Sequence, residues 1–274
     1  MSSDSQRESE FIMTIKAPAI VLKNITKYYG GMRVLNAVDF KITPGEVTCI
    51  LGDNGAGKST LIKIISGLHQ ADEGTMEIDG KKVRFNSPRE ALDAGIATVY
   101  QDLAVVDLME TWRNFFLGSE LRKNIPLLRP LNVKRMREIA KEELDRFGIH
   151  LANINQIVGT LSGGQRQCVS ITRAVYFGAK VLILDEPTAA LGVKQSSVVL
   201  NYVAKARKAG LAVVFITHNP HHAYLIGDHF VILKLGKVNL DARRADITSE
   251  QLIKEMAGGE ELTLLAEQLD SGNV

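Results

Sequence analysis

Residues 52–60, GDNGAGKST, carry the most specific chemistry in the chain. They fit the pattern G-x-x-x-x-G-K-[ST], in which glycines let backbone N–H groups turn toward phosphate oxygens. Lys58 would reach the β- and γ-phosphates of a nucleotide, and the Ser59 hydroxyl would take a place on Mg²⁺. An apolar run at 47–51 and helical spacing up to Gly67 predict the flanking strand and helix, which argues against a turn that binds nothing. The residues predicted to bind nucleotide here are Gly52, Asn54, Gly55, Gly57, Lys58, Ser59 and Thr60.

Further polar side chains directly follow predicted strands: Gln101, the pair Asp185 and Glu186, and His218. The carboxyl ends of parallel strands line the ligand crevice of an open sheet, so we expect all four beside the phosphate loop. Asp185 is placed to hold Mg²⁺, which prefers oxygen ligands. Glu186 is placed to orient or deprotonate a water, a role worth about 10²–10⁴-fold in rate. Gln101 could offer its amide oxygen to Mg²⁺ or to the water, and His218 could bond the γ-phosphate.

Each of these side chains also has a structural alternative. An acidic pair after a strand can be a loop entry or a helix cap, an exposed glutamine usually does nothing, and a strand-end histidine is more often structural. Four such markers at one sheet edge are not required by hydrophobic packing. His221 and His222 are expected to be surface residues of the next helix, because no Cys/His cluster has the spacing of a metal site.

A second glycine-containing stretch, LSGGQ at residues 161–165, opens a predicted helix that runs to about residue 175. Ser162 is expected to cap this helix, and Gly163, Gly164 and Gln165 would present backbone N–H groups at its positive end. The stretch predicts a second anion site. The chain could bind two anions, or two copies could close around shared nucleotides.

The bulk composition narrows the class of protein. Lys plus Arg is 33 against 31 Asp plus Glu, a balance that does not indicate nucleic-acid binding. Cys49 and Cys168 read as small buried hydrophobes in a reducing compartment. No apolar run approaches the ~20 residues of a membrane span, and the polar start of the chain resembles neither a signal peptide nor an anchor. We therefore expect a cytosolic chain whose membrane spans, if needed, come from another subunit.

The predicted fold class is α/β, with a mainly parallel sheet and helices, an added antiparallel β layer and an inserted helical subdomain. Asp79-Gly80 predicts a two-residue hairpin, and Ser87 to Glu90 a capping box with Pro88 at the first helical position. Few strand signals occur from 103 to 160, and a helix is expected over 132–147 with a solvated charged face. Strands are predicted at 19–29, 34–42, 47–51, 75–78, 82–85, 96–100, 181–184, 211–217 and 230–233. Other helices are predicted over 162–175 and 196–208, from 219–220, and from 248 to about 258.

In this order, GDNGAGKST, Gln101, LSGGQ, LILDEP and His218 resemble the ATPase subunit of an ABC transporter, over about residues 19–257. The resemblance implies a fold that binds ATP and Mg²⁺, and a homodimer in which LSGGQ of one subunit closes on the ATP held by the other. It implies that Tyr29 stacks on adenine, with Tyr28 the less favoured choice. Gln101 would sense the nucleotide and begin the helical region that contacts transmembrane permease subunits. Glu186 would be the catalytic base, and His218 would contact the γ-phosphate.

One position departs from that family. After the DEP strand such subunits usually read S-A-L-D, whereas this chain reads Ala189-Ala190-Leu191-Gly192. Because that aspartate normally helps couple the two sites, we expect their coupling to differ here. The runs DEPTAALGVKQ, TVYQDLA and NFFLG resemble importer ATPases for ribose, fructose and similar monosaccharides, which implies a sugar-binding protein outside the membrane as an indirect partner.

We therefore expect an ATPase domain over 18–259 with a helical subdomain at about 103–165, a disordered start over 1–17 and a loose tail over 260–274. The chain would lie on the cytoplasmic face of the cell membrane. A soluble ABC-type ATPase of translation or DNA repair is the first alternative, although no sustained heptads appear between Lys58 and Asp185. The motor of an exporter is the second, although exporter motors are often fused to membrane spans.

Overall fold

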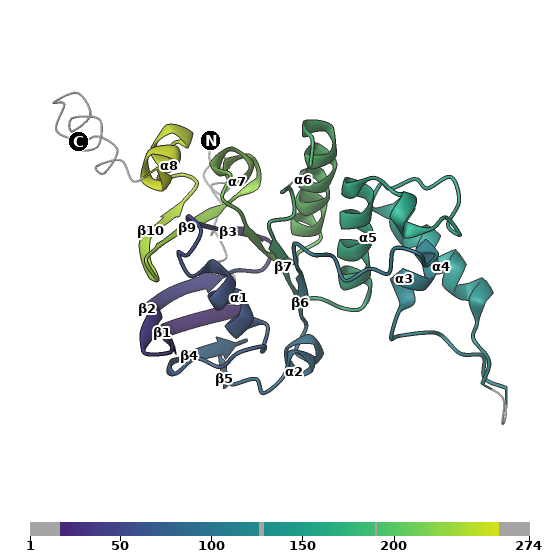
Figure 1. Cartoon of the computed structure of the whole chain (residues 1–274), viewed down its shortest axis with the longest axis horizontal. Helices are drawn as coiled ribbons and strands as arrows, with labels where there is room; N and C mark the ends of the chain where they lie inside the picture. Colours follow the sequence, from purple (N-terminus) through teal and green to yellow (C-terminus); the bar gives the residue numbers. More distant parts are fainter. Residues whose placement is uncertain (1–16, 126–128, 190, 258–274) are drawn as a thin grey trace, which may run out of the picture.

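The computed structural model describes residues 17–125, 129–189 and 191–257, and its centre is a six-stranded sheet in the order β10-β9-β3-β8-β7-β6 (Figure 1). Each strand from β9 to β6 is parallel to its neighbours, and β10 is antiparallel to β9. The mainly parallel sheet predicted from the sequence is confirmed. Its strands are β3 (Val47–Leu51), β6 (Ile96–Val99), β7 (Val181–Asp185), β8 (Ala212–Ile216), β9 (His229–Lys234) and β10 (Lys237–Arg243).

The predicted antiparallel layer is a four-stranded sheet in the order β2-β1-β4-β5. Asp79 and Gly80 both have positive φ, 49° and 76°, as the expected hairpin turn between β4 and β5 requires. The outer strands are shorter or longer than predicted by a few residues, since pairing rather than composition sets their ends. The four are β1 (Ile20–Tyr29), β2 (Met32–Ile42), β4 (Glu73–Ile78) and β5 (Lys81–Val83).

Side-chain alternation along β3 shows how the central sheet is covered. Cys49 and Leu51 pack into the core shared with α5, α6, α7 and α8, whereas Ile50 packs into the core shared with α1, α2 and the antiparallel sheet. Both faces are therefore buried, which explains the unbroken apolar run of this strand. The helices are α1 (Lys58–Ile65), α2 (Pro88–Asp93), α5 (Gly163–Tyr176), α6 (Val193–Lys208), α7 (Pro220–Ile226) and α8 (Ser249–Met256).

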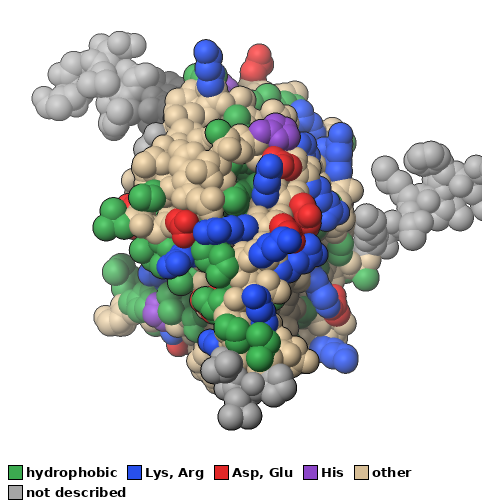
Figure 2. All heavy atoms as spheres, turned by 90° about the vertical axis from the view of Figure 1, so that its right-hand side faces the viewer, with side chains coloured by type: hydrophobic (Ala, Val, Ile, Leu, Met, Phe, Trp, Pro, Cys, Tyr) green, Lys and Arg blue, Asp and Glu red, His purple; other side chains and the backbone are tan. Residues whose placement is uncertain are grey.

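The expected helical region lies at one end of the molecule, beyond α5 (Figure 1). It contains α3 (Thr111–Phe116), α4 (Val133–Arg146) and the 3₁₀ turn η1 (Val158–Thr160), and α3 packs on α4 through its own small core around Trp112 and Met136. Met136, Ala140 and Leu144 of α4 are buried as their spacing predicted. Figure 2 views this end and shows Lys and Arg side chains with acids among them, as expected of a solvated face.

Three local expectations need correction. Strand β10 was missed, because its residues are alternately exposed and half-buried and three of the seven are charged. Helix α3 was missed because a six-residue helix is too short for a periodic signal. The predicted capping box at Ser87 forms only by half: Ser87 Oγ accepts from Glu90 N, but the Glu90 carboxylate accepts from Asn86 N instead of Ser87 N. The expectations for 1–16 and 258–274 lie outside the described residues.

Candidate nucleotide site

The strands that carry the predicted site residues are consecutive neighbours in the sheet, β3-β8-β7-β6. They are parallel, with Ile50 opposite Ile216, Asp185 opposite Ile216, and Val99 opposite Leu184. Their carboxyl ends therefore meet at one edge, and the phosphate loop, His218, the pair Asp185–Glu186 and Gln101 all start there. This adjacency was expected from the sequence and is confirmed by the pairing, whereas the roles of the individual side chains remain predictions.

The phosphate loop is a tight backbone turn around the ammonium group of Lys58. This buried group donates to the carbonyl oxygens of Gly52 at 2.6 Å and Asp53 at 3.0 Å. A Cβ on Gly52 would come within 2.3 Å of the Leu233 carbonyl oxygen, and the φ of Gly52, 142°, suits only glycine. Gly57, with φ 106°, similarly abuts Leu35 and forms the N-cap of α1. The predicted strand, glycine loop and helix are therefore present.

Glu186 is held by three donors. Its Oε1 accepts from the backbone N–H of His218 at 3.0 Å and from His218 Nδ1 at 2.9 Å, and its Oε2 accepts from Thr217 Oγ1 at 3.3 Å. Its own backbone N–H donates to Ile216 O at 3.0 Å, and its φ is +47°. A non-glycine residue in this region costs on the order of 1–3 kcal/mol, and such residues gather at functional sites.

Asp185 and Lys58 are electrostatically coupled across the same edge. Burial, and secondarily the charge of Glu186, raise the pKa of Asp185 above its ordinary value, while Lys58 and Lys63 partly offset the shift. Burial lowers the pKa of Lys58, against the opposing effect of Glu186, Asp53 and Asp185. The carboxylate of Asp185 therefore lies in surroundings that disfavour its charge, which a divalent cation would relieve.

Gln101 and Tyr29 are both open to solvent. Gln101 makes no hydrogen bond or ion pair to any described residue, so its predicted contact with Mg²⁺ or water is free to form. Tyr29 is 39% exposed and meets His69 edge-on, with ring centroids 5.8 Å apart. The Tyr28 hydroxyl accepts two bonds from Arg33, at 3.1 and 2.7 Å, and the guanidinium covers its ring. This engagement favours Tyr29 as the stacking residue.

Ser162 caps α5 as predicted, in a full capping box with Gln165. Close packing also favours glycine at both positions of this stretch. A Cβ on Gly163 would lie 2.7 Å from Leu191 Cδ2, and one on Gly164 would lie 3.2 Å from Gln195. No hydrogen bond or ion pair within the described part of the chain joins residues 162–165 to the phosphate loop. Figure 1 shows α1 and α5 on opposite sides of β6 and β7.

Two residues were missed or misread. Thr217, buried at the end of β8, bonds Glu186 and accepts from Asn219 N at 3.1 Å; a threonine closing an apolar strand before His218 was the available signal. His222 is not a simple surface residue. It is half-buried, its Nδ1 lies 2.9 Å from Thr188 Oγ1, and burial lowers the pKa of its ring. Helix α7 thus bonds to the loop that follows Glu186.

The predicted burial of the two cysteines is confirmed, whereas the predicted metal donors remain predictions. Cys49 and Cys168 are buried, and burial raises the pKa of Cys168 to about 12 and that of Cys49 further, so both are inert. Within residues 17–125, 129–189 and 191–257, no group of three His, Cys, Asp or Glu could hold a metal alone. A cation at Asp185 would depend on Ser59, Gln101, water and phosphate oxygens for its remaining ligands.

Residues 35–189 match the ABC transporter family. The chain is 43% identical over 86% of its length to the xylose/arabinose import ATP-binding protein XylG of Sulfolobus acidocaldarius, covering 92% of that protein. It is also 43% identical to the fructose import ATP-binding protein FrcA of Rhizobium meliloti, with 89% of this chain and 95% of that one covered. The ribose import ATP-binding protein RbsA of Bacillus licheniformis is 37% identical over 88% of this chain, which spans 48% of that protein.

Solved structures agree with this match. An ATP-binding cassette of an ABC transporter in its ADP conformation superposes with a TM-score of 0.77 at 26% identity, over 92% of this chain and 99% of that one. A dimeric cassette bound to ADP and Pi in a post-hydrolysis state gives 0.69 at 28% identity, over 82% and 98%. The chain belongs to the ABC transporter family and has the α/β fold of its ATP-binding cassettes. Among the described helices, none has the length and apolar character needed to cross a membrane.

Proposed function

We propose that this chain is the ATP-hydrolysing motor subunit of an importer for a monosaccharide. The observation that carries the proposal is the 43% identity, over nearly the whole of each chain, to the xylose/arabinose and fructose import proteins. The arrangement at the carboxyl ends of the strands supports ATP hydrolysis as the activity. It places the phosphate loop, the hydrogen-bonded carboxylate of Glu186 and the amide of Gln101, which bonds to no described residue, at one edge of the sheet.

Different residues of the chain bind the nucleotide and activate the attacking water. The N–H groups of the phosphate loop and Lys58 bind the β- and γ-phosphates, and Tyr29 stacks on the adenine. Glu186 accepts a proton from the attacking water, since Thr217 and His218 hold its carboxylate in one orientation. His218 contacts the γ-phosphate once its ring has gained a second proton or has left Glu186, and Gln101 positions the water. Fixing the base and the water in advance removes part of the entropic barrier.

Mg²⁺ would be held by Ser59, Asp185 and Gln101 and would neutralise charge on the transferred phosphoryl group. The fit rests on Asp185, whose pKa is raised by burial and by the charge of Glu186 so that a cation would stabilise its ionised form, and on the exposed Ser59 hydroxyl in the first turn of α1. Lys58 interacts with the acidic residues Asp53, Asp185 and Glu186, and Lys63 also acts on Asp185.

The functional unit we propose is a homodimer with ATP at the interface. Residues 162–165 present the N-terminus of a 14-residue helix, but α5 lies apart from the phosphate loop of its own chain (Figure 1). A second copy, paired head to tail, would bring this helix end to the nucleotide. The dimeric cassette among the structural neighbours supports this arrangement.

A separate permease would receive the movement. A cavity of about 250 Å³ lies between α2, β6 and α5, beside Gln101, and is lined by Leu92, Tyr100, Ala104, Arg173 and Phe177 among others. Leu92 and Phe177 are exposed there, at 50% and 39%. We propose that a cytoplasmic segment of the permease fills this cavity, so that a movement of Gln101 is transmitted to the membrane subunit.

Two measurements test the proposal. Uptake of labelled ribose, fructose and xylose in a strain lacking the chain should fall for one sugar and return with the wild type but not with Glu186→Gln. A detergent pull-down of the tagged chain should recover a polytopic permease and a sugar-binding protein. Unchanged uptake would contradict the sugar, and recovery of only ribosomal or repair proteins would favour a soluble ATPase. Export of a substrate instead of uptake would favour an exporter motor.

A further inference from the structure

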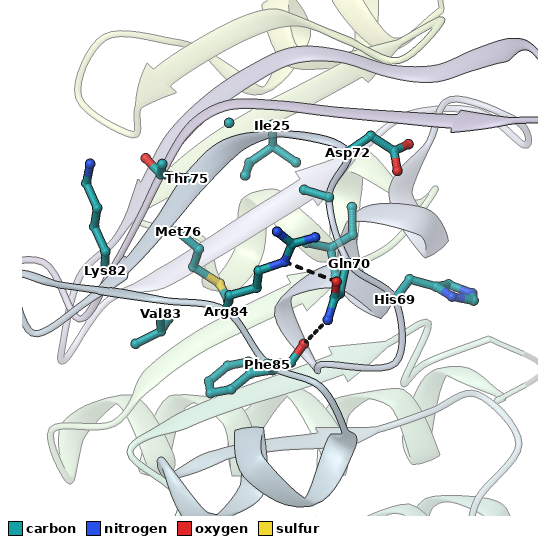
Figure 3. Close-up of a pocket in the computed structure, with 13 residues that line it drawn as sticks. Ile25, His69, Gln70, Asp72, Thr75, Met76, Lys82, Val83, Arg84 and Phe85 are labelled. Carbon is teal, nitrogen blue, oxygen red and sulfur yellow. Dashed lines mark hydrogen bonds between the residues drawn. The ribbon is translucent and has the colours of Figure 1, made fainter.

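A cavity of about 340 Å³ lies outside the nucleotide site, between the end of α1, the segment 69–72 and strands β4 and β5 (Figure 3). Its floor is apolar and its rim is polar, a combination typical of small-molecule sites, which occupy about 300–1,000 Å³. The apolar lining residues are Ile25, Ile64, Met76, Val83 and Phe85.

Arg84 is the polar group best placed to bind a ligand here. Its Nε donates to Gln70 Oε1 at 3.0 Å, and Gln70 Nε2 donates in turn to Asn86 Oδ1 at 2.9 Å and Phe85 O at 3.3 Å. Figure 3 shows the guanidinium reaching toward Gln70 across the cavity. The Nη1 and Nη2 groups have no hydrogen-bond or ion-pair partner among the residues that the structure describes. The head group is thus fixed at one nitrogen and free to donate at two.

The charges around the cavity leave a positive excess. Among the lining residues, Lys82 and Arg84 are basic and Asp72 is the one acid. Asp72 is already engaged, because its carboxylate accepts from Lys27 Nζ at 2.8 Å and from Tyr28 N at 2.7 Å, and these bonds lower its pKa. A single free guanidinium with two parallel donors matches a carboxylate, which it can bind in a bidentate way.

The cavity also touches the residue proposed to stack on adenine. His69 lines the cavity and meets Tyr29 edge-on at 5.8 Å. Asp72, on the same rim, holds the backbone of Tyr28. A ligand that moves His69 or Asp72 would therefore change the position of the Tyr29 ring.

We propose that this cavity is a regulatory site for a small organic carboxylate, whose acid group pairs with Arg84 and whose apolar body lies on Met76 and Phe85. Binding there and nucleotide binding at Tyr29 are linked through His69 and Asp72. By reciprocity, nucleotide changes the affinity for the carboxylate by the same factor.

The test uses the full chain labelled with ¹³C at its methionine methyl groups. The Met76 signal is assigned with Met76→Leu, and phenylacetate is titrated against its neutral isostere phenylacetamide. We expect a saturable change in the Met76 methyl chemical shift with phenylacetate and none with phenylacetamide. Arg84→Gln should weaken this binding at least tenfold, whereas Arg89→Gln should leave it unchanged, because Arg89 lies on α2 and pairs with Asp93.

Each contrary result is decisive. No saturable shift, an equal shift with phenylacetamide, or unchanged affinity in Arg84→Gln would overturn the site. Displacement of phenylacetate by inorganic phosphate at lower concentration would overturn the assignment to carboxylates. Saturating phenylacetate should also change the affinity for a fluorescent ADP analogue at least fivefold, and His69→Ala should remove this effect. An unchanged ADP affinity in the wild type would overturn the regulatory link.

Discussion

Glu186 Oε1 accepts both the backbone N–H and the ring Nδ1 of His218, at 3.0 and 2.9 Å. With Glu186 ionised, Nδ1 carries the proton, so Nε2 of a neutral ring is an acceptor. A neutral His218 therefore cannot hold Glu186 through Nδ1 and donate to a γ-phosphate through Nε2 at the same time. To contact phosphate, the ring must gain a second proton or leave Glu186.

This conflict gives the first prediction. In ¹⁵N spectra of the His218 ring, adding Mg²⁺ and a non-hydrolysable ATP analogue should either protonate both nitrogens or break the Nδ1 bond to Glu186. His218→Ala should lower kcat by roughly 10–100-fold, the effect of one hydrogen bond to a charged group. His221→Ala is the matched control, since His221 is exposed. An unchanged ring spectrum would contradict the proposed phosphate contact.

Glu186→Gln should lower ATP turnover by about 10²–10⁴-fold, the usual contribution of a general base. ATP binding should persist, because the glutamine oxygen can still accept from His218 N and so keep the local structure of the site. With Mg²⁺ and ATP the variant should therefore accumulate as a dimer in light scattering. Glu77→Gln is the control, since Glu77 of β4 forms its ion pair with Lys23 of β1, away from the nucleotide site. A Glu186→Gln protein that stays monomeric would count against the dimer.

Asp185→Asn should stabilise the ligand-free protein. Burial and Glu186 raise the pKa of Asp185, so the folded state holds its proton to a higher pH than the unfolded chain. Stability from this group is full below the unfolded pKa and is lost as pH rises through the folded pKa. At pH 7 the variant should therefore melt at a higher temperature than the wild type. At pH 3 the gain should vanish, and a gain that persists there would refute this cause.

Gly192→Asp should fold without cost, in contrast to Gly163→Ala. Gly192 is the N-cap of α6, with φ −68° and ψ 163°, and a Cβ there meets nothing within 4 Å. Aspartate could accept from the first N–H groups of α6, a gain of a few tenths of a kcal/mol over glycine. Gly163→Ala, whose Cβ would contact Leu191, should lower the melting temperature.

The same substitution tests the coupling expected from the departure at this position. If an aspartate here couples the two sites, Gly192→Asp should raise the Hill coefficient of ATP turnover. Val193→Ala, at the next and highly exposed position, controls for a surface change. Equal Hill coefficients in all three proteins would show that this position does not set the coupling.

The sequence by itself determined the local elements whose defining residues are close together along the chain. The glycine loop, the Ser162 cap and the Asp79-Gly80 hairpin depend on neighbouring residues and on backbone angles that few side chains allow. Strand polarity followed as well, since buried runs such as 181–184 end directly at Asp185. That these strands end at one edge of a parallel sheet could then be expected from the chemistry at their ends, whereas their order β3-β8-β7-β6 came from the structure.

Only the tertiary structure decided which atoms meet. The bonds from Thr217 and His218 to Glu186 join residues more than thirty positions apart, and the backbone N–H of Glu186, a residue with positive φ, donates to Ile216 O of β8. The half-buried position of His222 and the pairing of β10 likewise depend on packing that composition does not encode. The cavity at Arg84 exists because the antiparallel sheet, the segment 69–72 and the end of α1 meet there, and residue spacing along one chain cannot predict an empty volume between distant segments.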